Sequence, residues 1–150
     1  MSDRSIDAWE RMLETHAAVV GRLDAEMRRD HGVPLTWYEV LLILSRAPDG
    51  VLAMSDLADS LLLSRSAVTR LVDRMVSAGL VERRRCETDG RITFAAMTPE
   101  GSALFREAGR AHLRSVRRLF ADHLTEAEAN VMVAAFERVA ARSTGSPATV

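Results

Sequence analysis

The chain has 150 residues, of which 47% are hydrophobic and 27% charged, and its formal net charge is −1. This length corresponds to one domain with a sizeable core, and the hydrophobic fraction argues against intrinsic disorder. No segment approaches the about 18 consecutive apolar residues of a membrane span, and the opening residues lack the apolar stretch of a signal peptide, so we expect a cytoplasmic protein without a membrane partner.

Residues 5–31 are predicted to form a long helix that ends at Gly32 and Pro34. Its apolar positions step alternately by four and three residues, a spacing typical of a helix that packs along a partner. These positions are Trp9, Leu13, His16, Val20, Leu23 and Met27, widened by Met12 and Val19. Such a seam must be buried, and a second copy of the chain is the simplest way to cover it.

Thr36 and Glu39 have the spacing of a capping box, so a second helix is predicted to begin there, with Leu35 and Val40 as a hydrophobic staple. The Pro-Asp-Gly segment at residues 48–50 ends it. Residues 51–53 are short enough to form a strand that extends a small sheet.

The stretch from Leu57 to Gly101 carries most of the chemical information. Residues 55–63 predict a short helix capped by Ser55, followed by a turn in which Leu62 occupies a place where glycine would most easily allow a positive φ. A second helix is predicted from its N-cap Ser64 to Gly79. The two form a helix-turn-helix unit. The buried stripe of the second helix is expected to comprise Val68, Leu71, Val72, Met75 and Val76.

The opposite face of this second helix is polar. It carries Arg65, Ser66, Thr69, Arg70, Asp73 and Arg74. Short hydroxyls allow a helix to approach base edges, and arginine contacts guanine or phosphate. A solvated surface helix would show a similar face, but the helix-turn-helix context favours a recognition helix.

A basic hairpin follows. Residues 80–85 and 91–97 predict two strands, joined by a turn at residues 87–90 that contains the Asp-Gly pair typical of hairpins. Between Ser64 and Arg91, arginines outnumber acidic residues by seven to four. Positive charge is therefore concentrated in this part of a slightly acidic chain.

Two further helices are predicted. Thr98 caps the first of them, which should run to about His123, and Thr125 with Glu128 forms a capping box that opens the last, to about Arg142. The tail from Ser143 is expected to be frayed. The arginines of the first of these helices are interpreted as a solvated face: Arg106, Arg110, Arg114, Arg117 and Arg118.

The chain resembles the MarR (multiple antibiotic resistance regulator) family of transcription factors. The resemblance lies in residues 57–58, 63–75, 79–83, 89–91 and 97–101. It implies a mainly α fold with a small β-hairpin wing (α+β), in which a winged helix-turn-helix (about residues 36–98) is embedded in a helical dimerisation frame (about 5–31 and 98–142) as one domain, 1–150. It also implies a ligand-responsive repressor that binds a pseudo-palindromic operator in double-stranded DNA as a homodimer.

Roles for the polar residues follow from their positions. We expect Ser66, Thr69 and Arg70 to read base edges, and Ser64 and Arg65 to hold the helix N-terminus against phosphate. The remaining DNA contacts are assigned to Arg74, Arg84, Arg85 and Arg91, the last three at the minor groove or its phosphates. Asp89 should orient a neighbouring arginine. Asp73 could reach Arg91, and the resemblance implies that this pair ties the wing to the recognition helix.

The resemblance further implies a small, often anionic aromatic effector between the frame and the DNA-binding lobe. The candidate residues are His16, Trp37, Tyr38 and Arg46, although packing is the favoured explanation for His16 and Trp37. No cofactor or metal is expected, because the four histidines lack ligand spacing. An enzyme is not expected either, because a Gly-rich phosphate loop and a nucleophile motif are missing.

Two alternatives remain open. Cys86 could be an oxidant sensor if Arg83, Arg84 and Arg85 lower its pKa, or simply a tolerated neutral residue. The whole domain could be a winged-helix module for protein–protein interaction without specific DNA binding. The hydroxyls of the recognition helix and the basic wing favour DNA.

Overall fold

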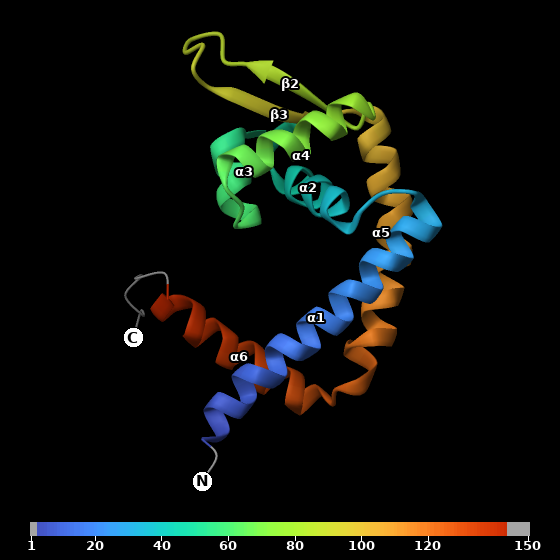
Figure 1. The fold of residues 1–150 in the computed structure, drawn as a ribbon, viewed down its shortest axis with the longest axis vertical. Helices are drawn as coiled ribbons and strands as arrows, with labels where there is room; N and C mark the ends of the chain where they lie inside the picture. The colour runs from blue at the N-terminus through green and yellow to red at the C-terminus, as the bar shows by residue number, and fades with distance from the viewer. Residues whose placement is uncertain (1–2, 144–150) are drawn as a thin grey trace. The chain divides into compact units, whose positions relative to one another are not determined.

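The computed structural model describes residues 3–143, which contain six α-helices and three strands (Figure 1). The helices are α1 (Arg4–His31), α2 (Leu35–Arg46), α3 (Met54–Leu61), α4 (Arg65–Ser77), α5 (Pro99–Leu119) and α6 (Glu126–Ser143). The strands are β1 (Val51–Ala53), β2 (Val81–Arg85) and β3 (Thr93–Met97), and short 3₁₀ turns occupy Pro48–Gly50 and Ala121–His123. The mainly helical fold with a small hairpin is confirmed, whereas the expected fraying after Ser143 falls outside the described residues.

The chain divides into two compact units, residues 1–114 and 115–150. In the first unit, the core joins α2, α3 and α4 to one face of the sheet. Its members are Val40, Leu41, Leu44, Leu57, Ala58, Val68, Leu71, Val72, Met75, Leu80, Val81 and Ala95. Within residues 3–143, no helix combines the length and apolar character needed to cross a bilayer.

The sheet is antiparallel, in the order β1-β3-β2. The predicted third strand is confirmed, since Ala53 pairs with Phe94 at the edge of β3. The hairpin differs from the expected tight Asp-Gly turn: β3 begins at Thr93 rather than at Arg91, and Gly90 does not have a positive φ. A longer loop closes it instead, with the Cys86 N–H donating to the Ile92 carbonyl over 3.0 Å.

The predicted start of α2 is wrong by one residue. The helix begins at Leu35, and neither Thr36 nor Glu39 caps it. The Leu35 N–H instead donates to Asp24 Oδ1 of α1 over 2.8 Å, so a carboxylate distant in sequence replaces the local capping box. Similarly, α3 begins at Met54 directly after β1, without a cap from Ser55.

Three other helix ends are confirmed. Ser64 Oγ accepts from the Ala67 N–H over 3.2 Å at the start of α4. Gly79 follows the end of α4 with a φ of 74°. At α6, Thr125 N–H donates to Glu128 Oε2 over 2.8 Å, and the Glu128 N–H donates back to Thr125 Oγ1 over 3.3 Å. These ends depend on neighbours within a few residues, and local sequence therefore sets them.

The apolar seam of α1 is only half covered. Leu23 and Met27 are buried, but Trp9 and Leu13 remain 55% and 47% exposed, and His16 is exposed as well. In the second unit, α6 buries none of its residues and exposes Val131, Val133, Phe136 and Val139. Five α5 arginines are solvent-facing as expected: Arg106, Arg110, Arg114, Arg117 and Arg118.

Candidate nucleic-acid interface

Helix α4 presents the predicted polar face to solvent. Its exposed side chains are Arg65, Ser66, Thr69, Arg70, Asp73 and Arg74. Ser64 Oγ lies 3.2 Å from Ser66 Oγ, so two hydroxyls adjoin at the first turn of the helix. Val76 does not belong to the buried stripe as predicted, because it sits on the margin of the last turn and is 37% exposed.

The turn before α4 has an unusual backbone. Leu62 adopts the left-handed conformation, with φ 55° and ψ 36°, and is the C-cap of α3. Its N–H donates to the Asp59 carbonyl over 3.2 Å, and the Leu63 N–H donates to the Ala58 carbonyl over 3.1 Å. Two backbone hydrogen bonds thus hold the turn against the end of α3, and the leucine side chain points away from the core with 91% exposure.

One arginine of the hairpin is bonded to the side of α4. Arg83 Nη2 lies 2.9 Å from Asp73 Oδ1 and donates to the Thr69 carbonyl over 3.3 Å. The predicted Asp73–Arg91 pair is therefore wrong: Asp73 does join wing and helix, but through Arg83. The alternation of side chains along β2 could have predicted this contact from the sequence, because Arg83 shares a strand face with the buried Val81.

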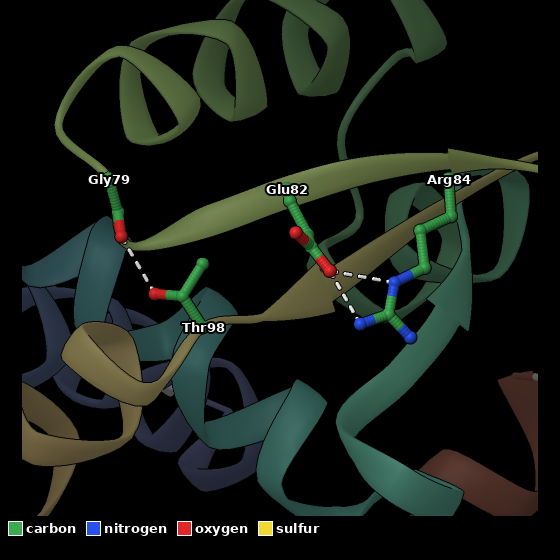
Figure 2. Close-up of polar contacts among 4 residues, drawn as sticks. All are labelled: Gly79, Glu82, Arg84 and Thr98. Carbon is green, nitrogen blue, oxygen red and sulfur yellow. Dashed lines mark hydrogen bonds and ion pairs between the residues drawn. The ribbon is translucent and has the colours of Figure 1, made fainter.

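The other face of β2 holds a second ion pair. Arg84 folds back along the strand, and its Nε donates to Glu82 Oε1 over 2.7 Å (Figure 2). Both side chains remain about half exposed. Arg85, at the end of the strand, is exposed to solvent. The strand therefore has two arginines already paired, Arg83 and Arg84, and one, Arg85, open to an anionic partner.

Arg91 lies in the hairpin loop with its side chain 94% exposed. Asp89 Oδ1 accepts from the Arg91 N–H over 3.0 Å and lies 3.5 Å from Arg91 Nε. This contact agrees with the predicted orienting role of Asp89. The same loop lowers the pKa of Cys86, through the Thr88 hydroxyl 3.2 Å from Sγ and then through backbone N–H groups. The expected cause, the arginines of β2, is therefore not the cause observed.

Thr98 connects the end of α4 to the start of α5. Its Oγ1 donates to the Gly79 carbonyl over 2.7 Å (Figure 2). The same oxygen accepts from the Gly101 N–H over 3.0 Å. The Thr98 N–H also donates to the Leu80 carbonyl over 3.2 Å. A Cβ on Gly101 would overlap that Leu80 carbonyl oxygen, so only glycine allows the two segments to approach this closely.

Sequence and structure comparisons identify the family. A model of the MarR family matches residues 31–92. The crystal structure of AbsC, a MarR family transcriptional regulator from Streptomyces coelicolor, is 31% identical to this chain, and the match covers 97% of both chains with a TM-score of 0.89. The chain belongs to the MarR family of transcriptional regulators.

Two further relatives place the chain within this family. Sco3205, a MarR family transcriptional regulator of Streptomyces coelicolor solved in complex with DNA, is 28% identical with a TM-score of 0.87, covering 94% of this chain and 88% of that chain. The transcriptional regulator MhqR of Bacillus subtilis is 24% identical over 139 residues, which are 93% of this chain and 86% of its own. The resemblance of this MarR chain therefore extends over the terminal helices as well as the helix-turn-helix.

In the structure of this MarR protein, the four residues predicted to bind an effector lie in different environments. Tyr38 is buried beneath α5, where it stacks on Phe105 with ring centroids 5.4 Å apart and approaches His112 at 4.7 Å. Burial raises the pKa of Tyr38, and the charge of Arg46 opposes that shift. Trp37 packs against the core. The exposed His16 acts electrostatically on Glu39 instead, whose pKa burial raises.

Two histidines near α5 were not predicted as site residues. His31 Nε2 and His112 Nδ1 are buried without a hydrogen-bond partner among the described residues. His31 Nδ1 lies 4.0 Å from Glu107 Oε1. The spacing of Phe105, Ala108 and His112 on one helical face was the available signal. Groups of three or more metal-ligating side chains are missing from residues 3–143.

Proposed function

We propose that this transcriptional regulator binds a specific site in double-stranded DNA as a homodimer and represses transcription until a small effector binds. The observation that carries the proposal is the attachment of the basic hairpin to the recognition helix α4 through Arg83 and Asp73, 2.9 Å apart. This pair holds two DNA-facing elements in one relative orientation. The complex of Sco3205 with DNA supports a DNA-binding role for a chain of this fold. Such a regulator works on the chromosome, and thus in the cytoplasm.

Each polar residue has a proposed task. Ser66, Thr69 and Arg70 face base edges in the major groove, and Arg74 contacts the flanking backbone. Ser64 and Arg65 place the positive end of α4 near a phosphate. The hairpin follows the adjacent minor groove through Arg84, Arg85 and Arg91. Arg84 would exchange its contact with Glu82 for a phosphate.

A homodimer explains the uncovered apolar side chains of the terminal helices. Trp9 and Leu13 of α1 and Phe136 of α6 are each about half exposed in a single chain. Because these side chains are already half covered, their complete burial against a second copy would be favourable by roughly 1 kcal/mol each, about half the value for a fully exposed side chain. A two-fold dimer places its recognition helices about 34 Å, or 10 base pairs, apart, so the operator should be a pseudo-palindrome.

Gel shifts with DNA from upstream of the encoding gene test this function. Arg91→Ala should weaken binding to all sequences, whereas Arg70→Ala should also relax the base preference. Arg106→Ala, an exposed arginine of α5 outside the interface, is the matched control. Binding should fall steeply as salt increases. If wild type and Arg91→Ala bind equally well, the role assigned to the hairpin is wrong.

The same experiment separates the rival function. A winged-helix module for protein–protein interaction would bind operator and unrelated competitor DNA equally weakly. Preference for one DNA sequence over a competitor of equal length and composition supports the regulator. The exposed hydroxyls and arginines of α4 favour that outcome, because they match the hydrogen-bonding groups of base edges and phosphates.

The effector is proposed to be a small anionic aromatic molecule that binds where α1, α2 and α5 meet. The buried Tyr38 and the nearby charge of Arg46 support an aromatic anion, whereas the exposed His16 would contact it from α1. Calorimetric titration with salicylate-like phenols should release or absorb heat, and His16→Ala should reduce the affinity. Absence of heat at millimolar ligand would count against an effector of this class.

A further inference from the structure

Leu62 combines two features that a leucine rarely shows together. Its backbone is left-handed, with φ 55°, a conformation that glycine adopts without the steric cost paid by a side chain. Its side chain is 91% exposed, the largest value among the exposed large hydrophobic residues of the described chain. Leucine at this place therefore adds backbone strain and contributes no core packing.

The fold does not require the leucine side chain here. The left-handed turn is maintained by two backbone hydrogen bonds, from the Leu62 N–H to Asp59 and from the Leu63 N–H to Ala58. Glycine would make both bonds equally well, as it does at many helix C-termini. Strained residues that the fold does not need are concentrated at functional sites. The side chain of Leu62 therefore calls for a functional explanation.

The position of Leu62 indicates what it contacts. It lies two residues before Ser64, the N-cap of the recognition helix. From Gly79, β2 runs back along α4, since Arg83 is bonded beside Thr69 and Asp73. The hairpin loop therefore lies toward the same end of α4 as the α3–α4 junction (Figure 1). Leu62 thus projects from the end of α4 that the proposed function inserts into the major groove.

The chemistry of the side chain selects the partner. An isobutyl group cannot bond to phosphate, a contact that the proposed function assigns to Ser64 and Arg65 instead. In the major groove, the one apolar group on the base edges is the 5-methyl of thymine. Leu63 adjoins Leu62 and is 42% exposed, so the apolar surface continues along the turn.

We propose that Leu62 is a specificity-determining residue, whose side chain packs against the 5-methyl group of one thymine in each operator half-site. This inference rests on the proposed DNA-binding function. It assigns the strained leucine to base discrimination, in addition to the hydrogen bonds made from α4. Burial of one methyl group corresponds to about a fourfold preference for thymine over a base without it.

The test uses the full-length protein and its operator, in which each thymine is replaced in turn by 2′-deoxyuridine, which lacks only the 5-methyl group. Wild type should lose about fourfold in affinity at one thymine per half-site. Leu62→Gly should lose a similar factor on the unmodified operator and lose nothing further on the substituted one. Leu62→Asn, which also tolerates a left-handed backbone, should behave in the same way.

Thermal melting serves as the folding control, because Leu62→Gly retains the turn and should not melt below wild type. Val76→Thr, an exposed apolar residue at the far end of α4, should keep the full sensitivity to deoxyuridine. The proposal is overturned if Leu62→Gly binds the operator as tightly as wild type, if it keeps the wild-type sensitivity to deoxyuridine, or if wild type is insensitive at every thymine. If wild type prefers no DNA sequence, the proposed function itself fails, which is a distinct result.

Discussion

The DNA-facing lobe and the terminal helices differ in how far they bury their apolar side chains. In the lobe, α2, α3, α4 and the sheet bury a shared apolar core, and the exposed face of α4 is polar. In α6, by contrast, none of the residues is buried, and the first half of α1 leaves Trp9 and Leu13 open to water. A single chain therefore buries the core of the lobe, whereas the terminal helices leave apolar side chains open to water. In the proposed homodimer, recognition would be built within one subunit, and the spacing of the two recognition surfaces would depend on the assembly.

The largest expected effect on this difference comes from placing a charged side chain on the exposed apolar face of α6. Phe136→Glu would place a carboxylate where the proposed dimer requires an apolar surface, and an unpaired buried charge is strongly unfavourable. We expect a monomer in sedimentation velocity and a loss of operator affinity of about thirtyfold or more, the scale of one lost aromatic anchor. Ser45→Glu adds the same charge at an exposed position of α2 and should remain dimeric. A dimeric Phe136→Glu protein with wild-type affinity would contradict the division.

Alanine substitutions at two glycines test how tightly each region is packed. Gly101→Ala would force a Cβ against the Leu80 carbonyl, with the Leu41 side chain also 3.2 Å away, so we expect a loss of about 1–3 kcal/mol in the free energy of unfolding. Gly21→Ala, in the interior of α1, meets nothing within 4 Å and should gain up to about 1 kcal/mol. Urea denaturation of both variants gives the comparison. Equal stability of Gly101→Ala and wild type would show that the junction is looser than described.

The attachment of hairpin to helix is tested by Asp73→Asn. Removal of a carboxylate near DNA should by itself favour phosphate binding, so a loss of affinity can come only from the release of Arg83. We expect a loss of about two- to fivefold, the range for one exposed ion pair. Glu82→Gln frees Arg84 within the hairpin and should bind as well as wild type or more tightly. If Asp73→Asn also binds more tightly, the pair has no orienting role.

The smallest expected effect concerns pH. Burial lowers the pKa of His112 below its usual value of 6.5, so the unfolded chain takes up a proton at this residue more readily than the folded chain. The contribution of His112 to the stability of the folded state is therefore complete above pH 6.5 and declines as the pH falls below that value toward the lowered pKa. His112→Phe should flatten the fall in melting temperature between pH 7 and pH 5.5. His123→Gln, an exposed control, should retain the wild-type slope, and a slope unchanged in His112→Phe would argue against this origin.

Sequence predicted the features that depend on near neighbours. The cap at Ser64, the stop at Gly79 and the reciprocal box of Thr125 and Glu128 each involve residues within a few positions, and all three are confirmed. The failures share a different cause. Asp24 rather than Thr36 completes the start of α2, and Arg83 rather than Arg91 reaches Asp73, because each partner comes from another element of the tertiary structure. The DNA contacts assigned to α4 and the hairpin remain predictions.

At Leu62 the expected turn conformation is present, although the residue is not one that usually adopts it. The turn chemistry called for a positive φ, and the chain adopts it although the residue is leucine. Propensity alone would have placed glycine there. Exposure could not be read from the sequence, since an apolar residue between two helices would ordinarily be assigned to the core.

The single hydroxyl of Thr98 has a mechanical consequence. It is bonded at once to the last carbonyl beyond α4, at Gly79, and to the first turn of α5, at Gly101. If α5 rotates about its axis, α4 must either follow or give up a 2.7 Å hydrogen bond. The close approach of Gly101 to the Leu80 carbonyl leaves little room for α5 to shift against the segment that follows α4. A rotation of α5 would therefore be transmitted first to residues 79–80, which are continuous in the chain with the recognition helix.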